Sequence, residues 1–146
     1  MAKRISYEHP LEKSGYVGSY RRIVMYEDLN AAGTMFGGSL VSWIDEAAAI
    51  YASCQMNFRR IVTKKISELV FRQPARLGDV LEVWCNVTKA GTTSLTIQAI
   101  VTRKVFPDVD DTQKKQKDNL QDNEICRCDL VFIAVDKSGR PIPWAI

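Results

Sequence analysis

The chain changes from one hydrophobic pattern to another near its middle, and the two patterns predict different structures. Between Phe36 and Phe58 apolar residues recur every three or four positions, which is the spacing of one face of a helix. From Ile61 onward apolar and polar residues alternate, imperfectly as far as Phe71 and then cleanly, as in half-buried antiparallel strands. We therefore expect one long helix followed by a set of strands.

Four further segments have the β-branched, aromatic and alternating residues of strands. They cover residues 20–26, 80–88, 95–101 and 125–135. The last three follow one another with turn residues between them and are expected to form a meander. Strands of this kind around one helix predict an α+β fold, in which a curled antiparallel β-sheet wraps one long central helix. A chain of 146 residues fits one domain over 1–146, with a polar lead-in over 1–19.

The predicted helix has almost no charged face. No Lys or Arg occurs between Gly38 and Asn57, and small residues surround the carboxylate of Asp45. Because a helix that is apolar nearly all round is a buried helix, we expect other structure to cover more than one of its sides.

Composition and charge exclude few classes of protein. Hydrophobic residues make up 46% and charged residues 25%, and the net charge of +3 is too small to indicate nucleic-acid binding. Acids and lysines alternate over 107–123, which predicts a solvated loop or hairpin insertion. Neither the first ten residues nor the segment around Asp45 has an apolar run long enough for a signal peptide or a membrane span. A cytoplasmic location without membrane attachment is expected.

The cysteines and the single histidine argue against several kinds of chemistry. The four cysteines are expected to be free, buried thiols, with Cys126 and Cys128 on the core face of one strand. No C-x-x-C pair is present, so we expect no metal site. His9 lies in the lead-in and is expected to be exposed, which argues against a Ser-His-Asp or Cys-His nucleophile.

The segment from Asn30 to Gly38 leads directly into the predicted helix. Gly37 and Gly38 at a helix start leave N–H groups free to stabilise negative charge, as in an oxyanion hole. Tight packing of the loop against the helix explains the same two glycines equally well. The carboxylate of Asp45 has no basic residue near it in the predicted helix. Because burying such a carboxylate is costly unless it is hydrogen-bonded or functional, Asp45 favours the interpretation as an oxyanion hole. Surface exposure of Asp45 is the alternative.

The spacing between these residues predicts a dimer. Asp45 lies seven residues beyond Gly38, which is roughly 10 Å along a helix, too far for both to act on one reacting group. If the helix start of one subunit faces Asp45 of a second across a two-fold axis, two equivalent composite sites result.

Three stretches of the chain resemble one known family, the hotdog acyl-CoA thioesterases. They are the Asn-x-x-Gly-x-x-Phe-Gly-Gly spacing at 30–38, the Asp at 45 and the run Phe-Arg-Gln-Pro-Ala-Arg-Leu-Gly-Asp at 71–79. The resemblance covers about 20–136 and implies the hotdog fold, hydrolysis of CoA thioesters, and a homodimer or a hexamer built as a trimer of dimers. It implies that Asp45 is the catalytic carboxylate, as general base or nucleophile, with Asn30 from the facing subunit and the amides of Gly37 and Gly38 as oxyanion donors.

The same resemblance implies where the substrate binds. CoA is part of the substrate, and no separate cofactor is implied. The implied substrate-binding residues are Phe36, Thr63, Gly91, Thr92 and Ser94. Family members commonly have Arg where Thr92 stands, so another cation is needed for the CoA phosphates. The candidates are Arg59, Arg60, Lys64, Lys65 and Arg72.

A second interpretation of the sequence stays open, a hotdog protein that binds acyl-CoA as a sensor without hydrolysing it. A dehydratase of the same fold would need a histidine near the helix, and none is present there. Trp43, Trp84 and Met56 either line the acyl tunnel or belong to the core or the dimer contact.

Overall fold

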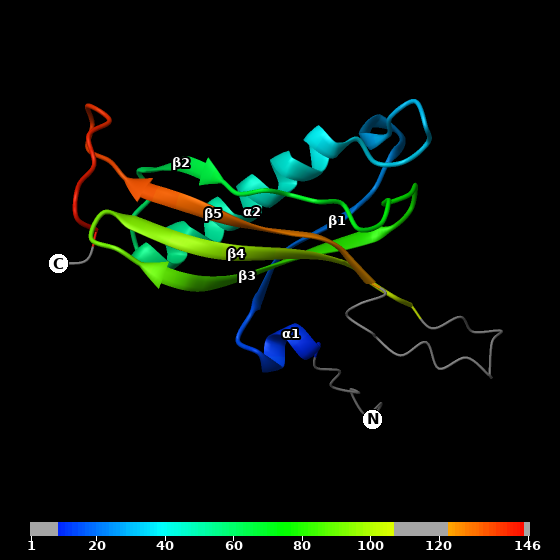
Figure 1. Ribbon diagram of the computed structural model, residues 1–146, viewed down its shortest axis with the longest axis horizontal. Helices are drawn as coiled ribbons and strands as arrows, with labels where there is room; N and C mark the ends of the chain where they lie inside the picture. Colours follow the sequence, from blue (N-terminus) through cyan, green and yellow to red (C-terminus); the bar gives the residue numbers. More distant parts are fainter. Residues whose placement is uncertain (1–8, 107–122, 145–146) are drawn as a thin grey trace, which may run out of the picture.

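A five-stranded antiparallel sheet curls around one long helix in the computed structural model, which describes residues 9–106 and 123–144 (Figure 1). The α+β prediction is confirmed. The helical elements are α1 (Pro10–Lys13), the 3-10 helix η1 (Tyr26–Asp28) and α2 (Gly37–Met56). The strands are β1 (Val17–Ile23), β2 (Ile61–Ile66), β3 (Val80–Ala90), β4 (Ser94–Arg103) and β5 (Glu124–Ala134).

The strands lie in the order β1-β3-β4-β5-β2. The three central strands follow one another in sequence and in space, as the predicted meander requires. β2 comes directly after α2 and pairs antiparallel with β5, the last strand. The chain therefore crosses the sheet through α2, which lies along the concave face (Figure 1), and β1 and β2 form the two edges.

α2 is close to the predicted helix and ends for a local reason. Phe36 before it is extended, with φ −64° and ψ 127°, so the helical conformation begins at Gly37. Asn57 after it has φ 49°, in the left-handed region that Asn tolerates better than most residues, and its N–H donates to the carbonyl of Ser53. Eight residues of α2 are buried against the sheet: Leu40, Trp43, Ile44, Ala47, Ala48, Tyr51, Ala52 and Met56.

The opposite face of α2 is open, which corrects the expectation that the chain itself would cover the helix on several sides. Ser42, Glu46 and Ile50 are exposed, and Asp45 is half-buried. The sheet covers one face because its five strands curl only partly around the helix axis (Figure 1). The uncovered face includes an apolar residue, Ile50, which is 50% exposed.

The alternation along the strands sets the core. On β5, Cys126 and Cys128 are buried with Leu130, Phe132 and Ala134, as the two-residue spacing predicts. All four cysteines are free, and three are buried. Cys54 is exposed near the end of α2, so the expectation of buried thiols is wrong for this residue.

The lead-in contradicts two expectations. Residues 10–13 form α1, and β1 begins at Val17, three residues before the predicted strand. His9 is buried rather than exposed, because its ring stacks on Trp84 at 4.3 Å between centroids and its Nδ1 accepts a hydrogen bond from the N–H of Leu11. α1 thereby covers Trp84 on the convex face of the sheet (Figure 1).

Two other predicted segments differ from the structure in extent. β2 ends at Ile66 because Ser67 replaces the regular ladder: its N–H donates to the carbonyl of Asp129 and its hydroxyl accepts from the N–H of Asp129. The predicted insertion over 107–123 lies outside the described residues except for Asn123. Within the described ranges, no helix is long and apolar enough to cross a membrane.

Candidate active site

The start of α2 presents two free backbone donors. None of the described side chains caps this end, and the first turn has no acidic residue. The N–H groups of Ser39 and Leu40 donate to the carbonyl of Phe36, whereas those of Gly37 and Gly38 make no hydrogen bond within the described residues. A helix N-terminus with free N–H groups stabilises a negative charge close to it.

The two glycines differ in how much space surrounds them. A Cβ at Gly37 would lie 3.3 Å from the ring of Phe71, a tight contact that this ring, which is 46% exposed, can relieve by a small shift. A Cβ at Gly38 would lie 2.7 Å from the ring of Phe36, but Phe36 is 56% exposed and free to move aside. Close packing therefore constrains both positions only through exposed rings that can move.

Asn30 is held rigidly beside the helix start. Its Oδ1 accepts hydrogen bonds from the N–H groups of Ala32 (3.0 Å) and Thr34 (3.1 Å), and its Nδ2 donates to the Thr34 hydroxyl at 3.1 Å. The turn is closed by Gly33 at φ 81°, a conformation that favours glycine. With Oδ1 occupied, the amide nitrogen of Asn30 is the group that remains available as a donor.

Asn30 and Gly37 line one cavity of about 330 Å³ between the start of α2 and the segment before β3. Its wall includes the apolar side chains of Met35, Leu40 and Phe71. Arg72 and Gln73 add polar groups to the same wall. The cavity thus combines hydrogen-bond donors with an apolar lining, as small-molecule sites usually do.

Asp45 does not line this cavity. It sits two turns further along α2, and its Oδ1 accepts a hydrogen bond of 2.7 Å from the hydroxyl of Thr63 on β2. None of the described ion pairs includes Asp45. A half-buried carboxylate held at one oxygen keeps its second oxygen available for a water or a substrate.

The other predicted substrate-binding residues lie in two places. Phe36 is exposed beside the helix start, whereas Gly91, Thr92 and Ser94 form the β3–β4 turn at the opposite end of α2 (Figure 1). One chain therefore brings Asn30 together with Gly37, and Asp45 together with Thr63, but does not bring all of the predicted residues to one point.

The β3–β4 turn is held by Trp144, a residue that no motif or spacing in the sequence singles out. Its indole N–H donates to the carbonyls of Gly91 and Ser94, both at 3.1 Å, and its backbone N–H donates to the carbonyl of Thr92. The N–H of Gly91 donates to the Ser94 carbonyl at 2.9 Å. The turn therefore has a fixed shape before any ligand binds.

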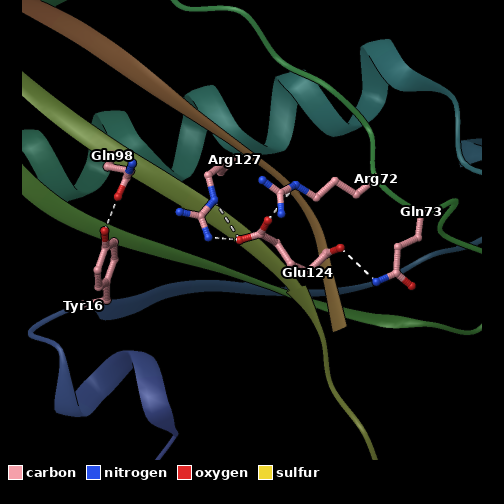
Figure 2. Close-up of polar contacts among 6 residues, drawn as sticks. All are labelled: Tyr16, Arg72, Gln73, Gln98, Glu124 and Arg127. Carbon is pink, nitrogen blue, oxygen red and sulfur yellow. Dashed lines mark hydrogen bonds and ion pairs between the residues drawn. The ribbon is translucent and has the colours of Figure 1, made fainter. Parts of the chain in front are cut away.

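The sequence analysis also did not single out Glu124, a buried carboxylate beside the cavity. Figure 2 shows Glu124 at the start of β5 between Arg127 and the cavity residue Arg72. Arg127 donates to Oε1 through Nε at 2.8 Å and through Nη2, and Arg72 Nε lies 3.1 Å from Oε2 in an ion pair bent too far for a hydrogen bond. Gln73 donates to the Glu124 carbonyl at 3.0 Å.

The remaining nucleophilic groups are poorly suited to catalysis. Burial raises the pKa of the Cys85 thiol to about 11 and that of Cys126 to about 12. Such thiols stay protonated at neutral pH and are weak nucleophiles. Among the residues that the structure describes, no three His, Cys, Asp or Glu side chains are grouped so as to hold a metal ion.

A curled antiparallel sheet around a central helix, with free amides at the helix start, places this protein in the hotdog class. A hexameric hotdog fold thioesterase of Campylobacter jejuni is similar over 86% of this chain and 88% of its own, with a TM-score of 0.70 and 26% identity. The chain belongs to the thioesterase superfamily, whose family model matches residues 32–105.

Two further relatives are named as acyl-CoA hydrolases. The acyl-CoA thioester hydrolase YciA of Salmonella typhimurium is 32% identical over 127 residues, which are 86% of this chain and 88% of the relative. An acyl-CoA hydrolase from Staphylococcus aureus, solved in complex with butyryl coenzyme A, is 29% identical with a TM-score of 0.67, over 85% of this chain and 68% of its own.

Proposed function

We propose that this protein hydrolyses acyl-CoA thioesters to the free acid and CoA. The observation that carries the proposal is the pairing of free helix N–H groups with the fixed amide of Asn30 at one cavity, in a chain similar to named acyl-CoA hydrolases. Hydrolysis of a thioester passes through a tetrahedral oxyanion, and donors fixed in advance lower the energy of that species.

In this proposal the N–H groups of Gly37 and Gly38 receive the thioester oxygen. They lie at the positive end of a 20-residue helix and have no hydrogen-bond partner to lose among the described residues, so little reorganisation accompanies the appearance of negative charge. The amide nitrogen of Asn30, which lines the same cavity, orients the thioester or the attacking water.

Asp45 of the second subunit supplies the attack on the acyl carbon. As a general base it takes a proton from water while the water oxygen bonds to the carbonyl carbon, and collapse of the oxyanion breaks the C–S bond and releases CoA thiolate, which is then protonated. As a nucleophile it forms an anhydride that water opens. Thr63 holds one carboxylate oxygen in either case.

The assembly is part of the proposal. Because Asp45 lies too far from Gly38 on its own helix, a homodimer in which two helices face each other across a two-fold axis completes two sites. The exposed face of α2, with Ile50, is available for that contact. A hexamer built as a trimer of dimers accommodates the same dimer, and related thioesterases are described as hexameric.

The test is release of CoA thiol from short, long and aromatic acyl-CoAs by the parent and by Asp45→Ala. We expect turnover by the parent and a loss of at least about a hundredfold in kcat for the variant. Glu46→Ala is the matched control, since Glu46 is the exposed neighbour on the same helix and should retain activity. Light scattering checks that the variants keep the parent's assembly.

Binding of acyl-CoA without release of thiol from any substrate would replace this proposal with the sensor. The proposal includes a reaction that needs no cofactor, so dialysis against EDTA should leave the rate unchanged. The expected cytoplasmic location stays a prediction, which cell fractionation checks.

A further inference from the structure

One charged side chain in the cavity wall is not needed by thioester hydrolysis itself. Besides the donors at Asn30 and Gly37, both polar and apolar groups line the cavity, and Arg72 is its charged residue. A guanidinium in a cavity wall is a strong hydrogen-bonding partner for an anionic ligand. The question is which anion Arg72 meets.

Glu124 contacts only one edge of the Arg72 guanidinium. The carboxylate lies near Nε at 3.1 Å, and within the described residues the two terminal nitrogens of Arg72 make no hydrogen bond. The side chain is 57% exposed, whereas that of Glu124 is only 3% exposed. Arg72 is thus anchored at one edge and presents the other edge, with its parallel N–H groups, to a ligand.

The charge of Glu124 is already matched by another residue. Arg127 contacts Oε1 through two of its nitrogens, and this contact raises the pKa of the Arg127 guanidinium. Two guanidinium groups therefore share one buried carboxylate, as Figure 2 shows. One positive charge remains, and it is nearest the cavity at Arg72.

The backbone fixes the position of this charge. The N–H of Arg72 donates to the carbonyl of Ile125 at 2.8 Å, and the side chain of the next residue, Gln73, donates to the carbonyl of Glu124. Arg72 is therefore attached to the start of β5 by its backbone and by its side chain, which reduces the entropy lost when it binds an anion.

Two parts of an acyl-CoA carry anionic groups: the phosphates of CoA and, in some thioesters, the far end of the acyl group. The cavity of about 330 Å³ is at the small end of the range of ligand pockets, roughly 300–1,000 Å³. The CoA nucleotide is several times larger, whereas a short acyl chain fits. The apolar lining also suits methylene groups better than a nucleotide.

We propose that Arg72 selects acyl-CoA substrates whose short acyl group ends in a carboxylate, the thioesters of dicarboxylic acids. This inference rests on the proposed hydrolysis and extends it to a substrate class. The apolar wall receives the methylene groups, the amides at Asn30 and Gly37 receive the thioester, and the free edge of Arg72 receives the terminal carboxylate.

The test compares two thioesters of equal carbon number, adipoyl-CoA and hexanoyl-CoA, which differ by a carboxylate in place of a methyl group. The measured quantity is the ratio of kcat/KM for adipoyl-CoA to that for hexanoyl-CoA. Arg72→Gln should lower this ratio about tenfold, because one charge-assisted contact is lost, while kcat/KM for hexanoyl-CoA stays within about twofold. Arg72→Lys keeps the charge and should restore part of the ratio.

Arg76→Gln is the matched control. Arg76 is exposed in the same segment and does not line the cavity, so its loss should leave the ratio unchanged. Thermal unfolding of each variant separates a loss of folded protein from a loss of selectivity.

Two results would overturn the inference: values of kcat/KM for both substrates that are unchanged in Arg72→Gln, or an equal fall for both substrates. The second would assign Arg72 to the CoA phosphates, and free CoA would then also inhibit the variant less strongly. If the parent releases thiol from neither substrate, the proposed hydrolysis fails instead. Calorimetric binding of the two intact thioesters then measures the ratio, and the same tenfold fall is expected.

Discussion

Thr63 is the residue that fixes the direction of the Asp45 carboxylate. The hydrogen bond between them, 2.7 Å long, joins α2 to β2 across 18 positions of sequence. A carboxylate with one oxygen held rotates less, so the second oxygen spends more time in a position to act on a water or on the acyl carbon. Thr63 therefore acts on the reaction through Asp45.

Thr63→Val removes the hydroxyl and keeps the shape of the side chain. We expect kcat to fall about tenfold with little change in KM, since a hydrogen bond of ordinary strength to the reacting group is lost. Steady-state kinetics with a saturating acyl-CoA measure the effect. Thr63→Ser keeps the hydroxyl and should retain most of the activity; an equal loss in both variants would mean that packing, and not the hydrogen bond, is responsible.

The sequence identifies some residues of the candidate site and misses others for a physical reason. Asn30, Gly37 and Asp45 stand out because their residue types and spacing suit one chemistry at a helix start. The contact between Arg72 and Glu124 depends on how the loop between β2 and β3 meets the start of β5 across a large separation in sequence. No local pattern encodes such a meeting.

At the scale of elements, the position of Cys126 and Cys128 on β5 determines how slowly their thiols react with reagents in solution. The alternation along β5 places Cys126 and Cys128 in the core, where burial raises the pKa of both thiols, to about 12 and about 11. Only the thiolate reacts with alkylating reagents, so raising the pH from 7 to 9 should leave both residues almost unmodified in the folded protein.

Iodoacetamide labelling followed by mass spectrometry checks this expectation. Cys54, which is exposed on α2, should be labelled in the folded protein, whereas Cys85, Cys126 and Cys128 should be labelled only after guanidinium unfolding. Labelling of Cys126 at the rate of Cys54 would show that β5 opens readily. The variant Cys54→Ser is the control, and it should take up no label while folded.

Elements were predicted well where a pattern repeats and poorly where it does not. β3, β4 and β5 are each ten or more residues long and contain an alternating stretch, and their predicted positions agree with the structure to within a few residues. α1 has only four residues, too few to show a helical period, and its position depends on Trp84 far along the chain. Tertiary contact rather than local preference forms such a helix.

At the scale of the whole molecule, the separation of Asp45 from the helix start predicts that two defective subunits can repair each other. Asp45→Ala and Asn30→Ala should each be nearly inactive alone. A mixed dimer has one site with both changes and one site with neither. Random pairing of equal amounts should therefore restore about a quarter of the parent activity.

Coexpression with two different affinity tags isolates the mixed dimer and allows its activity to be measured. Pairing Asp45→Ala with Asp45→Asn is the control, because both subunits lack the same group and no native site can form. Absence of recovery in a purified mixed dimer of Asp45→Ala and Asn30→Ala would mean that one chain supplies its own Asn30 and Asp45.

The stacking of His9 on Trp84 has a consequence for the order in which the chain folds. α1 contacts β3 and β4 together, since Trp84 and Ile100 form its apolar cluster with Leu11. A four-residue helix is not stable in isolation, so this segment has nothing to dock onto until the β3–β4 hairpin exists. This segment precedes β3 and β4 in the sequence, yet it is among the last to reach its final place, and the fluorescence of Trp84 should change in that late step.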